Sequence, residues 1–131
     1  MVLRKGVELL FLFSVLVLQG CVALVVGAGA GAATVAYIGG ELQTTQQAAF
    51  NRTWEASQGA MKDLEFKVNS SHKDATGGII EAEKADGTKI KLKLKPEGTD
   101  TTSVKIRVGV FGDEDVSKLI NRQISKRLGT R

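Results

Sequence analysis

The chain has 131 residues, a formal net charge of +4, one cysteine and one histidine. This length allows one small domain with a single core. One cysteine and one histidine exclude a disulfide framework and a metal site built from these residue types, so we expect no metal and no other cofactor. The positive charge falls well short of the concentrated charge of a dedicated nucleic-acid binder, so we expect no nucleic-acid partner.

The first 21 residues have the pattern of a bacterial lipoprotein signal. Arg4 and Lys5 form a basic start, residues 7–18 form an apolar run, and a small residue precedes Cys21. A charged n-region, an apolar h-region and small residues before the cleavage site are the parts that such a signal requires. We therefore predict a signal peptide over residues 1–20, cleavage before Cys21 and attachment to the membrane through its acylated thiol. The alternative is an ordinary membrane anchor with an incidental cysteine.

Residues 22–40 form a second apolar stretch, rich in glycine and alanine. We expect residues 21–40 to be a lipidated, membrane-proximal segment at the lipid surface. A small-residue tether is one alternative. A true span, in an inner-membrane complex component, is another, because about 20 apolar residues cross a bilayer. The glycines also imitate a dinucleotide-binding motif, but the chain lacks the βαβ context that this motif needs.

The remainder, residues 41–131, has the patterning of a small periplasmic α+β domain. Residues 41–45 predict a short first strand, and Thr44 or Thr45 is a plausible cap for a helix that runs to about Leu64. The apolar face of this helix consists of Phe50, Trp54, Met61 and Leu64, which recur at helical spacing. We expect Trp54 to be the central packing residue.

Four strand signals follow, over residues 66–70, 80–83, 88–95 and 103–110. A three-residue loop with Gly87 in the left-handed conformation pairs Ala82 with Ile90. The next turn pairs Leu94 with Val104 by the same logic, because residues opposite each other in an antiparallel pair share a face. One face of the sheet is then apolar and needs a cover.

The other face of the predicted sheet carries a stripe of basic residues: Lys91, Lys93, Lys95, Lys105 and Arg107. The register sets Lys93 opposite Lys105 and Lys91 opposite Arg107, and like charges in such positions mildly destabilise a sheet. A charged face most often serves solubility. The functional alternative is a contact for anionic lipid headgroups, cell-wall polymer or another envelope component.

The last predicted element is a helix over residues 114–128, with Asp113 as its cap and Gly129 at its end. Its buried stripe consists of Val116, Leu119, Ile120, Ile124 and Leu128. Two amphipathic helices and strands with one apolar face each predict an α+β two-layer sandwich, in which two helices cover one face of an antiparallel sheet of about four to five strands.

Several segments also resemble a known family. They are Leu18 to Cys21, Tyr37 to Leu42, Ala49 to Trp54, Met61 to Leu64, Lys73 to Gly78, Ala85 to Thr88 and Ile106 to Asp113. With them the chain resembles the DUF3568 family of uncharacterised bacterial lipoproteins. The resemblance implies an envelope protein of a Gram-negative-type bacterium but brings no activity or catalytic residue. Val22 after the lipidated cysteine, in place of Asp, favours the outer membrane, facing the periplasm.

The sequence gives catalysis little support. Ser70 or Ser71 with His72 and Asp74 offers the residue types of a nucleophile, a base and its orienting acid. Neighbouring residues of an extended strand point to opposite faces, which argues against such a site. We therefore expect a non-enzymatic, lipid-anchored binding or structural module, with a small envelope hydrolase that uses His72 as the alternative.

Overall fold

The computed structural model describes residues 35–130. The predicted signal peptide, Cys21 and residues 22–34 lie outside the described residues. In chain order the elements are β1 (Val35–Ile38), β2 (Glu41–Gln46), α2 (Phe50–Asp63), β3 (Lys67–Asp74), β4 (Gly77–Glu83), β5 (Lys89–Pro96), β6 (Thr102–Val108) and α3 (Glu114–Leu128).

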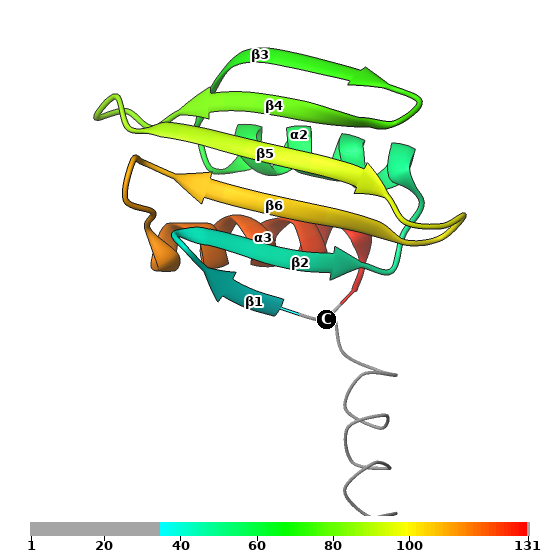
Figure 1. The fold of residues 1–131 in the computed structure, drawn as a ribbon. Helices are drawn as coiled ribbons and strands as arrows, with labels where there is room; N and C mark the ends of the chain where they lie inside the picture. The colour runs from blue at the N-terminus through cyan, green and yellow to red at the C-terminus, as the bar shows by residue number, and fades with distance from the viewer. Residues whose placement is uncertain (1–34, 131) are drawn as a thin grey trace, which may run out of the picture. The chain divides into compact units, whose positions relative to one another are not determined.

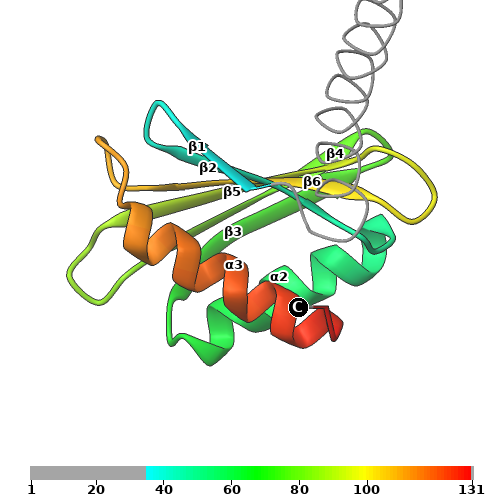
Figure 2. The same cartoon turned by 90° about the horizontal axis from the view of Figure 1, so that it is seen from below.

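The six strands form one antiparallel sheet in the order β1-β2-β6-β5-β4-β3 (Figure 1). Both helices lie on the same face of this sheet (Figure 2). Helix α3 packs against β2 and β6, and helix α2 packs against β3, β4 and β5. The α+β two-layer architecture is therefore confirmed.

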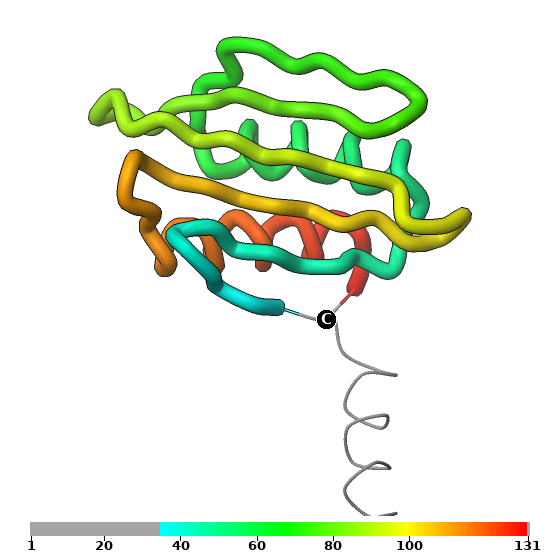
Figure 3. Tube along the Cα trace, viewed as in Figure 1, coloured from blue at the N-terminus to red at the C-terminus, as the bar shows by residue number. Residues whose placement is uncertain are grey.

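The path of the chain explains how a short sequence closes one core (Figure 3). After β2 the chain crosses the sheet through α2 and then returns strand by strand, β3 to β6, until β6 pairs with β2. The pairing of β2 with β6 thus joins strands that are far apart in sequence. The two edge strands of the sheet are β1 and β3.

The sheet has one strand more than the sequence predicts, because β1 lies within the segment assigned to the membrane surface. Gly39 and Gly40, with φ of +60° and +82°, form the turn between β1 and β2. Two residues with positive φ are what a tight hairpin turn requires. The sequence places the apolar side chains before this turn at the lipid surface, whereas in the structure they form an edge strand.

The predicted registers between the later strands are confirmed. Ala82 pairs with Ile90, and Leu94 pairs with Val104. The loop between β4 and β5 closes with a hydrogen bond from the Lys84 amide to the Thr88 carbonyl at 2.9 Å, and Gly87 has a φ of +86°. The two-residue repeat alone therefore identified which side chains face the helices.

Trp54 on α2 is buried, as expected, with 5% of its surface exposed. Its ring lies against Gly78 on β4, at the place where any Cβ of residue 78 would stand. Lys73 stands over the same ring, with its ammonium 5.7 Å from the ring centroid. The tryptophan therefore fits because the strand beneath it carries no side chain at this position.

Helix α3 has the predicted bounds and caps. The Asp113 carboxylate accepts a hydrogen bond from the Val116 amide at 3.1 Å, and Gly129 ends the helix with a φ of +73°. The prediction for Leu119 is wrong, because this side chain is 39% exposed. Ser117 is buried in its place, since positions 117, 120, 124 and 128 share one face of a helix with 3.6 residues per turn.

Two further predictions at element ends are wrong. Thr44 and Thr45 do not cap a helix, because β2 continues to Gln46 and α2 starts after Ala49 without a side-chain cap. Thr44 instead points to the core and is 3% exposed. At the other end of the domain β6 stops at Val108, because Gly109 with a φ of +73° breaks the alternation.

Candidate anionic-surface contact on the open sheet face

The helices leave one face of the sheet open, and all five predicted contact residues lie on it. Along β5 and β6 the burial alternates, so that the apolar residues between them are buried under the helices. On the open face Lys91, Lys93, Lys95 and Lys105 are exposed, and Arg107 is half-buried. The predicted stripe is therefore a continuous surface feature, but its members have different surroundings.

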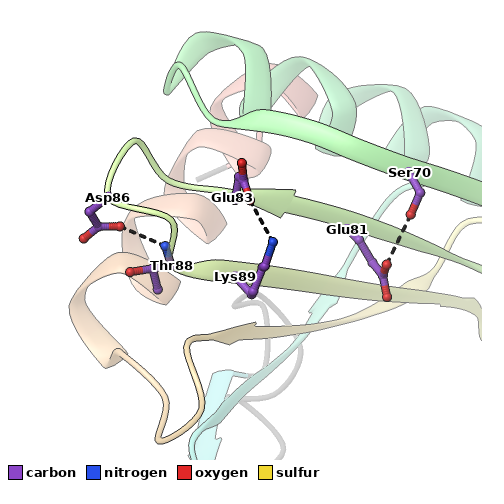
Figure 4. A network of polar contacts seen from close by, with 6 residues as sticks. All are labelled: Ser70, Glu81, Glu83, Asp86, Thr88 and Lys89. Carbon is purple, nitrogen blue, oxygen red and sulfur yellow. Dashed lines mark hydrogen bonds and ion pairs between the residues drawn. The ribbon is translucent and has the colours of Figure 1, made fainter.

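Carboxylates neutralise the part of the open face near the β4–β5 turn. Lys89 forms an ion pair with Glu83 at 2.8 Å, and Lys91 forms one with Glu81 at 3.6 Å. Figure 4 shows Glu81 also accepting a hydrogen bond from the Ser70 hydroxyl, at 3.2 Å. The hydrogen bond from Lys89 holds the pKa of Glu83 below its ordinary value. An anionic partner would have to compete with these carboxylates for Lys91.

Arg107 serves the fold at the same end of the sheet. Its guanidinium donates hydrogen bonds to the Gly39 carbonyl at 3.0 Å and to the Val110 carbonyl at 3.3 Å. It thus ties the β1–β2 turn to the loop between β6 and α3, where the backbones of Gly40 and Gly112 are in close contact. This arginine is better explained as a brace between two loops than as a free contact residue.

The remaining basic residues, Lys93, Lys95 and Lys105, form what we call the lysine patch. Across the sheet the neighbours of Lys93 are Ile79 and Lys105, and Gln43 is the next neighbour of Lys105. Lys95 lies opposite Ser103. Within residues 35–130 no carboxylate is directly opposite a lysine of the patch in these registers. Glu41 and Glu81 stand diagonally to Lys105 and Lys93 on this face, but they lie directly opposite Arg107 and Lys91. The patch therefore keeps a net positive charge for a partner.

The residues considered for catalysis do not come together as a site. His72 lies on the edge strand β3, exposed and opposite Ile79. Ser70 donates its hydroxyl hydrogen bond to Glu81 at 3.2 Å. Asp74 accepts bonds from the Thr76 hydroxyl at 2.6 Å and the Thr76 amide at 2.8 Å, which hold the pKa of Asp74 below its ordinary value. The serine and the aspartate are thus bonded to residues other than the histidine.

Two surface features escaped sequence reasoning. A groove of about 630 Å³ lies between α2 and β3, with Phe66 and Val68 among its lining residues. Val110 and Phe111 stand at the tip of the loop after β6 and are 84% and 95% exposed. In the sequence the flanking Gly109 and Gly112 are a local sign that the strand pattern ends before these two apolar residues, and both have a positive φ in the structure.

The described part of the chain has neither a membrane-crossing helix nor a ready metal site. In residues 35–130 no helix is long and apolar enough to cross a membrane. The same residues contain no group of three or more His, Cys, Asp or Glu side chains that could hold a metal ion.

Comparison with known proteins gives a family but no function. No curated protein matches the chain. One protein family matches residues 6–127, nearly the whole sequence, and it is described as "Protein of unknown function (DUF3568)". The chain belongs to this family of proteins of unknown function, DUF3568.

Proposed function

We propose that the protein is a lipid-anchored, non-enzymatic module of the bacterial envelope that binds an anionic component through its open sheet face. The observation that carries the proposal is the asymmetry of the sheet. Two helices cover one face, while the other exposes three lysines whose neighbours in the sheet do not neutralise them. A sheet face of this kind presents a flat positive surface to a partner.

The position of β1 supports an anchor at Cys21 over a span within residues 22–40. Val35 is already paired with β2, so 13 residues remain between Cys21 and the sheet. About 20 apolar residues are needed to cross a bilayer. A span would therefore have to include the apolar run before Cys21, which requires that the signal peptide is retained.

The location in the outer membrane, facing the periplasm, is part of the same proposal. It rests on the processing pattern that ends at Cys21 and on Val22 as the residue after it. The absence of enzymatic activity is proposed because His72, Ser70 and Asp74 are exposed and have separate partners or none that would orient a base. A catalytic base needs a positioned partner within hydrogen-bond reach.

The anchor is tested by the intact mass of the chain extracted from its native membrane, with fragmentation of the amino terminus. We expect a chain that starts at Cys21 and carries a diacylglyceryl group. A chain that retains residues 1–20 with an unmodified thiol would contradict the anchor and favour a span.

The open face is tested by the salt-sensitive association of the purified chain with envelope fragments from cells that lack it. Replacement of Lys93, Lys95 and Lys105 by Gln is expected to weaken the association at low salt without lowering the melting temperature, because the substitutions remove the repulsion between Lys93 and Lys105. Association that is unaffected by these substitutions would rule out the open face as the binding surface.

The hydrolase alternative has its own test. A His72→Ala chain should restore every phenotype of a deletion strain, because the proposed module needs no base. Loss of function in this variant with unchanged thermal stability would favour the hydrolase instead.

A further inference from the structure

We infer that the lysine patch docks on the anionic headgroups of the bilayer that holds the chain's own amino-terminal anchor. This rests on the proposed function, because it takes the anionic component to be a lipid surface near the anchored residue. It also narrows the predicted stripe of five basic residues to Lys93, Lys95 and Lys105.

The lysine patch lies close to the point where the chain joins the sheet. Val35, the first described residue, pairs with Thr44, which pairs with Val104, which pairs with Leu94. Lys93 and Lys95 are the residues on either side of Leu94, and Lys105 follows Val104. The patch is therefore level with the point where the chain enters the sheet, two to three strands away or about 10–15 Å at the usual strand spacing.

The segment that links Cys21 to the sheet is short. Thirteen residues separate Cys21 from Val35. Even fully extended they reach at most about 45 Å. An anchor at Cys21 thus keeps the domain close enough to the bilayer for short-range electrostatic contact. Each lysine near an anionic leaflet adds a modest attraction to the headgroups, and this attraction is similar from one lysine to the next.

The composition of the patch also suits a lipid surface. Ile79 lies on the open face directly opposite Lys93 and is 42% exposed. An apolar side chain among lysines suits the boundary between headgroups and acyl chains. Glu97 and Asp100 belong to the loop between β5 and β6 and not to a strand of the face. The positive surface therefore ends after Lys95, and neither carboxylate lies among the three lysines.

The lysines of the helix layer provide a control within the same molecule. Lys62 belongs to the last turn of α2, and Lys118 and Lys126 belong to α3, so all three lie in the layer on the other side of the sheet from the patch. They are exposed and equal in number to the patch. A response that reflects net charge alone would affect both sets, whereas docking affects the patch alone.

The experiment measures lysine acetylation rates by mass spectrometry on the full chain as isolated from its membrane. The chain is reconstituted into vesicles of phosphatidylcholine, with or without phosphatidylglycerol. In the anionic vesicles we expect acetylation of Lys93, Lys95 and Lys105 to slow roughly fivefold or more, the ratio that one lysine's attraction of about 1 kcal/mol gives. The control lysines should react equally in both vesicles, and high salt should abolish the difference.

Three results would overturn the inference. One is equal patch rates in the two vesicles, and another is equal slowing of the control lysines. The third is protection that appears in neutral vesicles only when isolated cell-wall polymer is added, which would assign the patch to the polymer. The mass of the same isolated chain reports separately on Cys21, so failure of the anchor and failure of the docking can be told apart.

Discussion

The side chains on the two faces of the sheet interact in different ways. On the covered face Leu42, Leu92 and Ile106 are completely buried, and their shapes must fit the helices above them. On the open face the side chains interact through their charges. Lys89 forms an ion pair with Glu83, whereas Lys93 lies opposite another lysine, Lys105. Packing against the helices therefore determines the fold on the covered face, and the open face is free to serve as a contact surface.

The energetic consequence is a difference in tolerance. Buried side chains at native packing density react to a change of one methyl group. Exposed substitutions away from special features usually change stability by less than about 0.5 kcal/mol. Substitutions on the covered face should therefore cost more stability than substitutions on the open face.

The largest effect is expected for Gly78→Ala on the covered face. The new methyl group would occupy the space of the Trp54 ring, so we expect a loss of about 1–3 kcal/mol in the free energy of unfolding. Chemical denaturation monitored by Trp54 fluorescence measures it. Gly98→Ala is the matched control, because a methyl group there meets nothing within 4 Å. Equal stability of the two variants would refute the close fit of Trp54 on β4.

The next effect concerns the helix that covers β2 and β6. Asp113→Ala removes the bond to the Val116 amide and should cost about 1 kcal/mol. Asp115→Ala, in the same first turn, removes a carboxylate near the positive end of the helix dipole but no cap, so it should cost less. Thermal denaturation of both variants checks the order. A larger loss for residue 115 would show that the dipole, and not the cap, stabilises this end.

A pH-dependent effect is expected where the two helices meet. Arg127 donates two hydrogen bonds to the Asp63 carboxylate, at 2.6 and 2.7 Å, and Gln123 donates a third at 2.7 Å. The bonds from Arg127 and then Gln123 lower the pKa of Asp63 from 3.8 to about 2. Because the folded pKa lies below the unfolded one, the stabilisation is complete above about pH 4 and is lost as the pH falls through 2.

The difference between the unaltered chain and Arg127→Gln reports this contact. It should be largest above about pH 4 and should shrink as acid protonates Asp63. Arg122→Gln removes the same charge from the same helix and serves as the control. A difference that stays constant between pH 5 and the acid limit would mean that Arg127 acts through packing over Gly59, which its guanidinium covers.

The fold could be predicted from the sequence wherever the alternation of apolar and polar residues was strong and local. The alternation along residues 88–95 gave the register on both sides of β5, because a slip of one residue would expose every apolar side chain. Prediction from the sequence failed at Val35, which belongs to a strand, and at Thr44, which does not cap a helix. Apolar residues next to a lipidation signal suit a membrane surface as well as an edge strand, and a threonine that continues a strand looks the same as one that caps a helix.

The candidate site was predictable only in part. The sequence placed five basic residues on one face, but it could not show that Arg107 bonds to the Gly39 carbonyl, 68 residues away. Which carbonyl a long side chain reaches depends on the loops beyond the strand, whereas a two-residue repeat specifies only the face. By contrast, the register set by the three-residue loop at Gly87 places Glu81 opposite Lys91 from the sequence alone, and the structure confirms this pair with an ion pair at 3.6 Å.

The smallest predicted effects are those on the open face, and they have opposite signs. Lys93→Gln removes a charge that stands opposite Lys105, so it should raise the free energy of unfolding by a few tenths of a kcal/mol. Lys89→Gln removes the partner of Glu83 and should lower it by a similar amount. Denaturation at low salt and in 1 M salt measures both, and screening should bring both variants back to the unaltered chain.

This difference in sign bears directly on function. Solubility benefits from net charge but does not require Lys93 and Lys105 to stand directly opposite each other, because like charges in such positions destabilise the sheet and other lysines of the same sheet stand opposite glutamates. If Lys93→Gln stabilises the fold and also weakens association with the anionic surface, the repulsion is a cost that binding offsets. If it does neither, the lysine patch is a solvated surface, and the partner must be sought at the α2–β3 groove or at the exposed Val110 and Phe111.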